Sequence, residues 1–194
     1  LIFNLSLFII LVTTIININE TFSVSRITLF NQSVVIDHLS SFMKTITLIF
    51  GFLVLIISSS YLKTFKLFNI EYPILILSSI LGMMVMISSN DLIVFYMGLE
   101  LQSLSLYVLA SFNKNNLLST ESGLKYFILS ALSSGLLLYG CSLIYGFSGS
   151  TNFVQISQNI NANQYTLTFG IVFILVGLAF KISAVPFHMW APDV

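Results

Sequence analysis

Six apolar stretches, each close to the length that crosses a bilayer, take up most of this 194-residue chain. A membrane helix needs roughly 20 mostly apolar residues. Charged residues make up 7% of the chain, whereas a soluble domain usually contains about 25%. These features exclude a water-soluble globular enzyme and predict an all-α polytopic membrane protein, with a single transmembrane domain over 1–194. The expected spans are 1–18, 42–62, 73–89, 92–112, 124–147 and 167–190.

The charge balance and the cysteine content exclude further classes. Seven basic and seven acidic residues give a net charge of zero, so the chain has no basic field to favour a nucleic acid partner. The single cysteine, Cys141, rules out a disulfide framework and a cysteine-built metal or iron–sulfur site. The sequence contains no nucleotide-binding loop, haem ligand pair or nucleophile–base constellation. We therefore expect no redox cofactor and no metal in this chain.

The connections between the spans are short, except for two polar segments at 19–41 and 148–166. Both are too small to form domains. The second contains NFVQISQNI, which we interpret as a short interfacial helix. Asp91, in the tight connection before the fourth span, suits the start of a helix.

Loop charges predict the orientation of the spans. With six spans, the connections on the side of the N-terminus carry Lys63, Lys66 and Lys114, whereas the opposite loops carry Arg26. Because positively charged loops are retained inside, the N-terminus is expected in the cytoplasm or the mitochondrial matrix.

Glu100 is an acidic residue that is expected near the centre of the bilayer, its most apolar part. It lies nine residues into the fourth span, which at about 1.5 Å per residue is roughly 14 Å deep. A charge near the bilayer centre costs about 2.5–3.5 kcal/mol on insertion scales. Tyr96, Ser103 and Tyr107 share its helical face. The functional interpretation is a proton or ion site, and the structural alternative is an interhelical hydrogen-bonding group.

Lys125 lies near the start of the fifth span, one turn after Glu121. A Glu–Lys pair at this spacing stabilises a helix, and an interfacial lysine can extend its ammonium to water. The second interpretation is a pair between Lys125 and Glu100, which projects from the preceding helix. Such a pair would relieve the desolvation of both groups and couple their charge states.

Lys181 lies about twelve residues into the last expected span, and Pro186 follows five residues later. Proline cannot donate to the carbonyl of Ile182 and clashes with it, so the helix should break or kink there. Broken helices at membrane depth need buried protein or a water cavity around them. A midplane ammonium beside a discontinuous helix is typical of an ion-transport site. The alternative is a cation neutralised by a buried acid.

Two residues after the break also carry polar groups. His188 is interpreted as an interfacial histidine, with a proton relay as the second interpretation. Trp190 is expected in an aromatic belt at the membrane edge.

Three stretches together resemble one family. They are GLELQSLSLYVLASF (98–112), ESGLKYFILSALSSGLLLYG (121–140) and GLAFKISAVPFHMWAPDV (177–194). Their order and spacing are similar to the antiporter-like subunit 2 of the proton-pumping NADH:ubiquinone oxidoreductase, respiratory complex I. The resemblance covers the N-terminal part of such a subunit, most of the first of its two inverted five-helix repeats.

The resemblance implies roles for particular residues. It implies a polar pair between Glu100 and Lys125, and a proton-carrying Lys181 on a discontinuous helix. It also implies that the chain itself holds no FMN, iron–sulfur cluster or ubiquinone, which belong to other parts of the complex. The implied partners are other membrane subunits, especially a neighbouring antiporter-like subunit and a small chain resembling subunit 4L, together with lipids.

Several expectations concern the whole protein. Because the second repeat and its central lysine are absent, we expect either a fragment or a subunit split between two polypeptides, and we favour the split. Abundant Phe, Ile and Asn suggest AT-rich codons and the mitochondrial inner membrane, with a bacterial plasma membrane as the alternative. The alternative functions are a subunit of a multisubunit cation/proton antiporter or membrane-bound hydrogenase, and a scaffold that has lost pumping.

Overall fold

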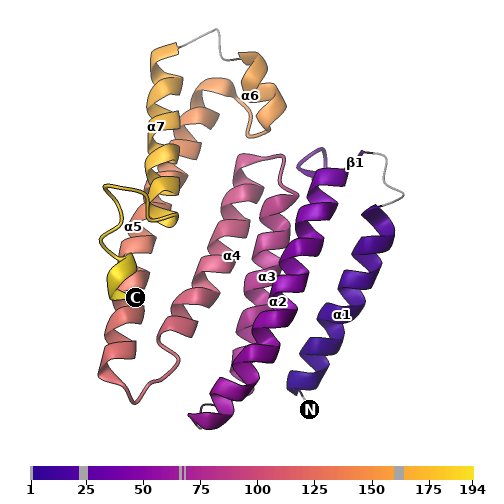
Figure 1. The fold of residues 1–194 in the computed structure, drawn as a ribbon. Coiled ribbons are helices and arrows are strands. Elements are labelled where there is room, and N and C mark those ends of the chain that lie inside the picture. The colour runs from indigo at the N-terminus through magenta and orange to yellow at the C-terminus, as the bar shows by residue number, and fades with distance from the viewer. Residues whose placement is uncertain (1, 22–25, 66, 68, 160–163) are drawn as a thin grey trace.

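The apolar stretches form a bundle of long helices (Figure 1). The structure is a computed structural model, and it describes residues 2–21, 26–65, 67, 69–159 and 164–194. The elements are α1 (Ile2–Thr21), β1 (Ile27–Leu29), β2 (Val34–Ile36), α2 (His38–Thr64), α3 (Glu71–Ile87), α4 (Leu92–Ala110), α5 (Leu117–Ser148), α6 (Phe153–Asn159), α7 (Gln164–Lys181) and a 3₁₀ turn, η2 (Ala191–Asp193).

Each of the six expected spans corresponds to one helix. Among the described residues, α1, α2, α4 and α5 are long and apolar enough to cross a membrane. The other two, α3 and α7, have 17 and 18 residues, at the lower limit for a spanning helix. The prediction of an all-α polytopic membrane protein is confirmed. The short helix expected in NFVQISQNI is also present, as α6.

A small β-hairpin joins α1 to α2, and the sequence did not reveal it. β1 and β2 pair antiparallel, with Thr28 opposite Val35. Strands of three residues are too short to show the alternation by which a strand is recognised in sequence.

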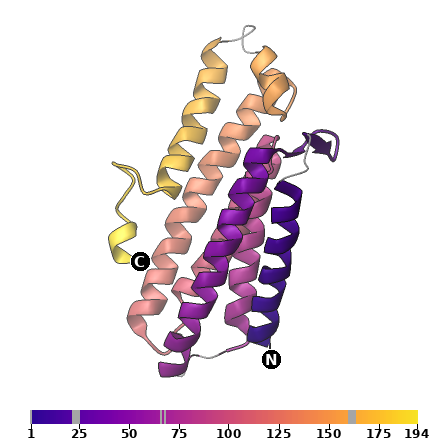
Figure 2. The same ribbon diagram turned by 45° about the vertical axis from the view of Figure 1, so that its right-hand side comes forward.

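The helices lie side by side along one long axis, with α5 and α7 on one flank and α1 on the other (Figures 1 and 2). One apolar cluster joins α1, α2 and α3 around Leu48, Leu55 and Ile80. A second joins α4, α5 and α7 around Leu137 and Cys141. The predicted site lies on the α4, α5 and α7 side of the bundle.

Glycines bring neighbouring helices into close contact. A Cβ on Gly82 of α3 would lie 2.8 Å from the carbonyl oxygen of Gly98 in α4. A Cβ on Gly140 of α5 would lie 2.8 Å from the carbonyl oxygen of Gly170 in α7. Small residues at such crossings let backbones approach, and packing of this kind drives helix association in membranes.

At one end of the bundle, three connections are hydrogen-bonded to each other. The amide of Val35 in β2 donates to the carbonyl of Ser88 at 2.8 Å, and the amide of Leu92 donates to the carbonyl of Thr151 at 2.9 Å. The side chain of Asp91 accepts from the backbone of the first turn of α4, as expected for the start of a helix. These contacts hold the N-terminal end of α4.

The last helix is interrupted, as predicted, but it ends at Lys181 rather than continuing toward residue 190. Ser183 adopts a left-handed backbone with φ of 51°. The amide of Ala184 donates to the carbonyl of Ala179 at 2.8 Å, and the amide of Ser183 donates to the carbonyl of Phe180 at 3.2 Å. This is the Schellman arrangement, which satisfies carbonyls left open at a helix end. The chain thus leaves the helix one turn before proline would have broken it.

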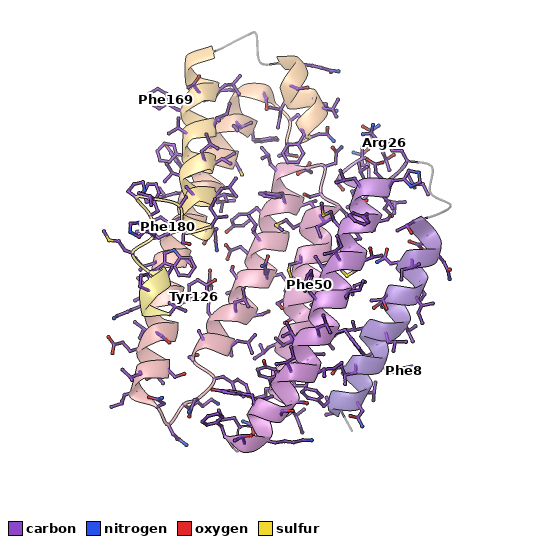
Figure 3. All side chains as sticks on the ribbon, viewed as in Figure 1. Phe8, Arg26, Phe50, Tyr126, Phe169 and Phe180 are labelled. Carbon is purple, nitrogen blue, oxygen red and sulfur yellow. The ribbon has the colours of Figure 1, made fainter. Side chains whose placement is uncertain are left out.

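The exterior of the bundle is largely apolar. Phe8, Phe50 and Phe169 project outward from α1, α2 and α7 (Figure 3), and all three are exposed. Such a surface suits contact with lipid tails or with other apolar helices.

The connections also place the loop lysines. Lys63 in the last turn of α2 and Lys114 in the α4–α5 connection lie at the end where α1 begins, and Arg26 lies at the opposite end (Figures 1 and 3). Lys66 lies outside the described residues. The described loop lysines therefore lie at one end of the bundle and Arg26 lies at the other, as the predicted orientation requires.

Candidate functional site

Glu100 of α4 and Lys181 of α7 meet inside the bundle. The lysine Nζ lies 3.6 Å from the glutamate Oε1, and their side chains are 10% and 20% exposed, respectively. Removing each charge from water costs several kcal/mol. Two charges about 4 Å apart attract by about 4 kcal/mol at an effective dielectric constant of about 20. Because these energies are of similar size, the pair adds little net stability. Its notable property is that it places two opposite charges in the interior of the bundle.

The ammonium of Lys181 has a second partner on the same helix as Glu100. Its Nζ donates a hydrogen bond to the hydroxyl of Tyr107 at 3.0 Å. Lys181 is also the last residue of α7, where the helix dipole favours a cation by about 0.3–1 kcal/mol. The lysine is thus held by a carboxylate, a phenol and a helix end.

The carboxylate of Glu100 is less completely bonded. Its Oε1 is buried and accepts no hydrogen bond from the described residues. The hydroxyl of Ser103 bonds to the backbone carbonyl of Glu100 at 3.2 Å, not to the carboxylate. An open acceptor of this kind can bind a proton or a water molecule.

A partly open cavity of about 380 Å³ adjoins Lys181. Lys181 lines it together with Gln102, Ser103 and Tyr126, and the remaining walls are apolar. Water occupies about 30 Å³ per molecule in the liquid. The cavity therefore has room for several water molecules beside the ammonium.

The expected pair between Glu100 and Lys125 is wrong. Lys125 forms an ion pair with Glu121 at 2.9 Å, and the side chains are 43% and 59% exposed, respectively. The register explains the difference, because Gly123 of α5 packs against Ser111 at the end of α4. Counted from that contact, Lys125 lies nine residues short of the level of Glu100, or roughly 13 Å at 1.5 Å per residue. The two side chains do not span that separation.

The segment after α7 contains the remaining predicted residues. Pro186 lies in the irregular stretch beyond the helix, and His188 is exposed there. Within the described part of the chain, the structure records no hydrogen bond to the ring of His188, so it is not brought to the Glu100–Lys181 pair.

Trp190, for which a place in an aromatic belt at the membrane edge was expected, is held by a hydrogen bond and a ring contact. Its indole Nε1 donates to the carbonyl of Phe180 at 2.9 Å, and its ring stacks on Tyr126 with centroids 4.7 Å apart. These contacts tie the segment after α7 to α5.

Residues 89–194 match the family described as NADH:quinone oxidoreductase/Mrp antiporter, TM. The chain belongs to this antiporter family. The match covers α4, α5 and α7, and so includes both members of the buried pair. The resemblance read from the three sequence stretches is confirmed.

Individual members of the antiporter family are closely similar in sequence. A protein of Pelagibacter ubique named NADH-quinone oxidoreductase subunit N is 70% identical over 191 residues, which is 98% of this chain and 40% of that protein. A protein of the same name from Maricaulis maris is 54% identical over 166 residues, which is 85% of this chain and 35% of the relative. This chain thus spans less than half the length of these curated relatives.

Two solved structures share the fold. A chain of respiratory complex I from Thermus thermophilus with bound aureothin superposes with a TM-score of 0.81 at 26% identity, covering all of this chain and 41% of that one. A chain of the Mrp complex from Dietzia superposes with a TM-score of 0.78 at 21% identity, covering 97% and 37%. The second likeness shows the fold alone.

The relatives correct the expected compartment. The curated antiporter-family relatives reported above come from bacteria and are named subunit N, so the mitochondrial inner membrane and the name subunit 2 are not supported. The chain is a multi-pass membrane protein, and the alternative of a bacterial plasma membrane fits its relatives.

Sequence reasoning missed one contact of the Glu100–Lys181 pair. Tyr107 was placed on the face of Glu100 but was not linked to Lys181. Its position seven residues after Glu100, two turns along one face, was the available signal. The partner on α7 could not be read from that spacing, because it depends on how α7 packs.

Proposed function

We propose that this chain forms part of a proton-translocating, antiporter-like membrane subunit of an NADH:quinone oxidoreductase. In this proposal Lys181 loads and releases a proton, and Glu100 responds to the change of charge. The observation that carries it is the buried ammonium–carboxylate pair, 3.6 Å apart, at the end of an interrupted helix. The 70% identity to a protein named NADH-quinone oxidoreductase subunit N supports the choice of complex.

The geometry suits a group that exchanges protons. Two ionisable groups this close titrate as a coupled pair, so that a proton gained by one changes the charge state of the other. The unbonded Oε1 of Glu100 and the cavity beside Lys181 provide an acceptor and a place for water. Net translocation also requires at least two states of the protein that interact differently with the proton.

The proposed path contains four residues. Glu100 and Lys181 form its centre, replacing the relay through a Glu100–Lys125 pair that the sequence suggested. Lys125 and His188 are proposed as its outer members, because both side chains reach the surface of the described structure. Oxidation of NADH and reduction of quinone, with FMN and iron–sulfur clusters, are assigned in this proposal to other subunits.

Replacement of Lys181 tests this proposal. In the full-length subunit within its purified complex, Lys181→Ala should slow proton transfer through this site about 100-fold, the scale expected for loss of a positioned acid or base. Proton release in proteoliposomes, measured per NADH oxidised, should fall. Lys44→Gln, a lysine of α2 outside the pair, is the matched control and should leave the ratio unchanged. Glu100→Gln should weaken turnover more than the control does.

An unchanged proton-to-electron ratio in Lys181→Ala would refute the proposed role. Together with intact assembly, that result would favour the alternative in which this part of the subunit is a structural scaffold.

A second function, transport in a multisubunit cation/proton antiporter, is favoured by one observation. The matching family includes Mrp antiporters as well as NADH:quinone oxidoreductases. Sodium-dependent transport, with no NADH-oxidising partners on purification, would support this function over the first.

The proposed partners follow from the proposed complex. They are other membrane subunits of NADH:quinone oxidoreductase, including a neighbouring antiporter-like subunit and a small chain resembling subunit 4L, with lipids around them. The proposed location is the bacterial plasma membrane, consistent with the bacterial relatives.

A further inference from the structure

Tyr107 and Glu100 both face the ammonium of Lys181. Both residues project from α4, seven residues apart, which places them on one face. The Nζ of Lys181 lies 3.0 Å from the hydroxyl of Tyr107, within hydrogen-bonding distance, and 3.6 Å from Oε1 of Glu100, outside it. An ammonium has three N–H donors, so the phenol does not use up the donor that Glu100 needs. By accepting one of them at 3.0 Å, it fixes where Nζ lies, and that place is out of hydrogen-bonding distance of Oε1.

The ring of Tyr107 is fixed by aromatic neighbours. Tyr107 is 5% exposed, and its ring is in T-shaped contact with those of Tyr126 and Phe127 on α5, with centroids 4.7 and 5.7 Å away. Edge-to-face arrangements at these distances are favourable. A phenylalanine at position 107 would keep these ring contacts, so packing alone does not explain the hydroxyl.

The same group of aromatic rings also contacts Phe180, the residue before Lys181, through Trp190. Tyr126 stacks on Trp190 with ring planes 11° apart. The indole of Trp190 donates to the carbonyl of Phe180 at 2.9 Å, and Phe180 precedes Lys181 in the last turn of α7. The side chain of Lys181 and the backbone next to it are thus both anchored to the same stack of rings.

We propose that Tyr107 is a positioning residue that holds the ammonium of Lys181 away from the carboxylate of Glu100. A direct ammonium–carboxylate hydrogen bond is shorter and about twice as strong as a neutral one, and it would keep the proton and both charges in one place. The bond to the phenol keeps Nζ at a fixed place and leaves Oε1 of Glu100 open to a proton or a water molecule. The proposal deepens the proposed function and depends on it for its consequence in pumping.

Tyr107→Phe in the full-length subunit of the purified complex tests this role, because it removes the hydroxyl and keeps the ring. In a cryo-electron microscopy structure, the Nζ–Oε1 distance between Lys181 and Glu100 should shorten to about 2.7–2.9 Å. Proton transfer per turnover should fall about tenfold, the factor that corresponds to one hydrogen bond to a charged group. Tyr139→Phe, which removes the hydroxyl of an exposed tyrosine of α5, is the control and should change neither quantity.

A double variant separates positioning from a merely structural role. If Tyr107 acts by keeping Lys181 off Glu100, Tyr107→Phe should have no further effect on pumping once Glu100→Gln is present. Losses that add independently would overturn the proposal, as would an unchanged Nζ–Oε1 distance in Tyr107→Phe.

Trp190→Phe provides a second line of evidence. It keeps a ring over Tyr126 but removes the donor to the carbonyl of Phe180, so a smaller shortening of the same distance is expected. An unchanged distance in both Trp190→Phe and Tyr107→Phe would refute the proposal.

The positioning role and the proposed function can fail separately. If Lys181→Ala leaves pumping unchanged while Tyr107→Phe still shortens the Nζ–Oε1 distance, the proposed function fails and the positioning role stands.

Discussion

A carboxylate and an ammonium lie together in the low-dielectric interior of this bundle, and the attraction between them offsets the desolvation cost of each. Glu100 and Lys181 are both largely buried, and the carboxylate oxygen nearest the lysine has no hydrogen bond among the described residues. Removing one partner leaves an uncompensated charge, whereas replacing both with uncharged side chains leaves none. Stability and function can therefore be separated by comparing single and double variants.

Lys181→Met should destabilise the full-length subunit by about 3–5 kcal/mol, the usual result of stranding one member of a buried pair. Adding Glu100→Gln should recover most of that loss, because the remaining amide is neutral. Thermal unfolding of the purified complex, followed by loss of assembled subunit, measures both. A double variant no more stable than Lys181→Met would contradict the buried-pair interpretation.

The pairing of α3 with α4 depends on the absence of side chains at the crossing. Gly82 and Gly98 face each other's backbone, and the hydroxyls of Ser78 and Ser105 hydrogen-bond across the same interface at 2.7 Å. Close packing leaves no room for an added methyl group. Since Glu100 lies on α4, this contact also fixes the carboxylate relative to the rest of the bundle.

Gly82→Ala should destabilise the protein by about 1–3 kcal/mol, as overpacking usually does. Its Cβ would lie 2.6 Å from the backbone nitrogen of Gln102, so the helices must separate. Gly135→Ala in α5 is the matched control, because a Cβ there meets nothing within 4 Å. The control should be neutral or stabilising by up to about 1 kcal/mol. Melting temperatures of the two variants, compared with wild type, test the difference, and equal values would contradict it.

Over the whole molecule, the end of the bundle that carries the hairpin joins segments far apart in sequence. The side-chain amide of Asn90 donates to the carbonyl of Gln32 at 2.9 Å, and the amide of Asn152 donates to the same carbonyl at 3.2 Å. The hydroxyl of Thr151 donates to Asp91 at 2.6 Å. These bonds position the first turn of α4 and, through it, the helix that carries Glu100 and Tyr107.

Thr151→Val should loosen this end by about 1.5–3 kcal/mol, the value for a hydrogen bond to a charged group. Hydrogen exchange should become faster at the start of α4 and in the β2 segment. Thr64→Val is the control, because its hydroxyl bonds the Ser60 carbonyl of its own helix at 2.9 Å. Exchange that accelerates equally in both variants would show that the Thr151–Asp91 bond has no special role.

Much of the helical framework could be predicted because it depends on local sequence. Apolar runs of about 20 residues predict helices wherever the bilayer is the solvent. The side chain of Asp91 marks the start of α4. Pro186 predicts an interruption of the last helix, although α7 already ends at Lys181. Glu100 and Lys181 were recognised for a similar reason, since a charge within an apolar run is costly regardless of its partner. The β-hairpin was missed because its pairing, not its composition, defines it.

Only the tertiary structure decided which charged residue pairs with Glu100. The sequence placed Glu100 within reach of Lys125 on the next helix, but the packing of Gly123 against Ser111 sets a register that separates them. The packing of α7 on α5, where Gly140 lies against Gly170, brings the end of α7 to Glu100 and Tyr107. Charge, polarity and helix length are properties of residues and their near neighbours, whereas the relative height of two helices depends on small-residue contacts between segments far apart in the chain.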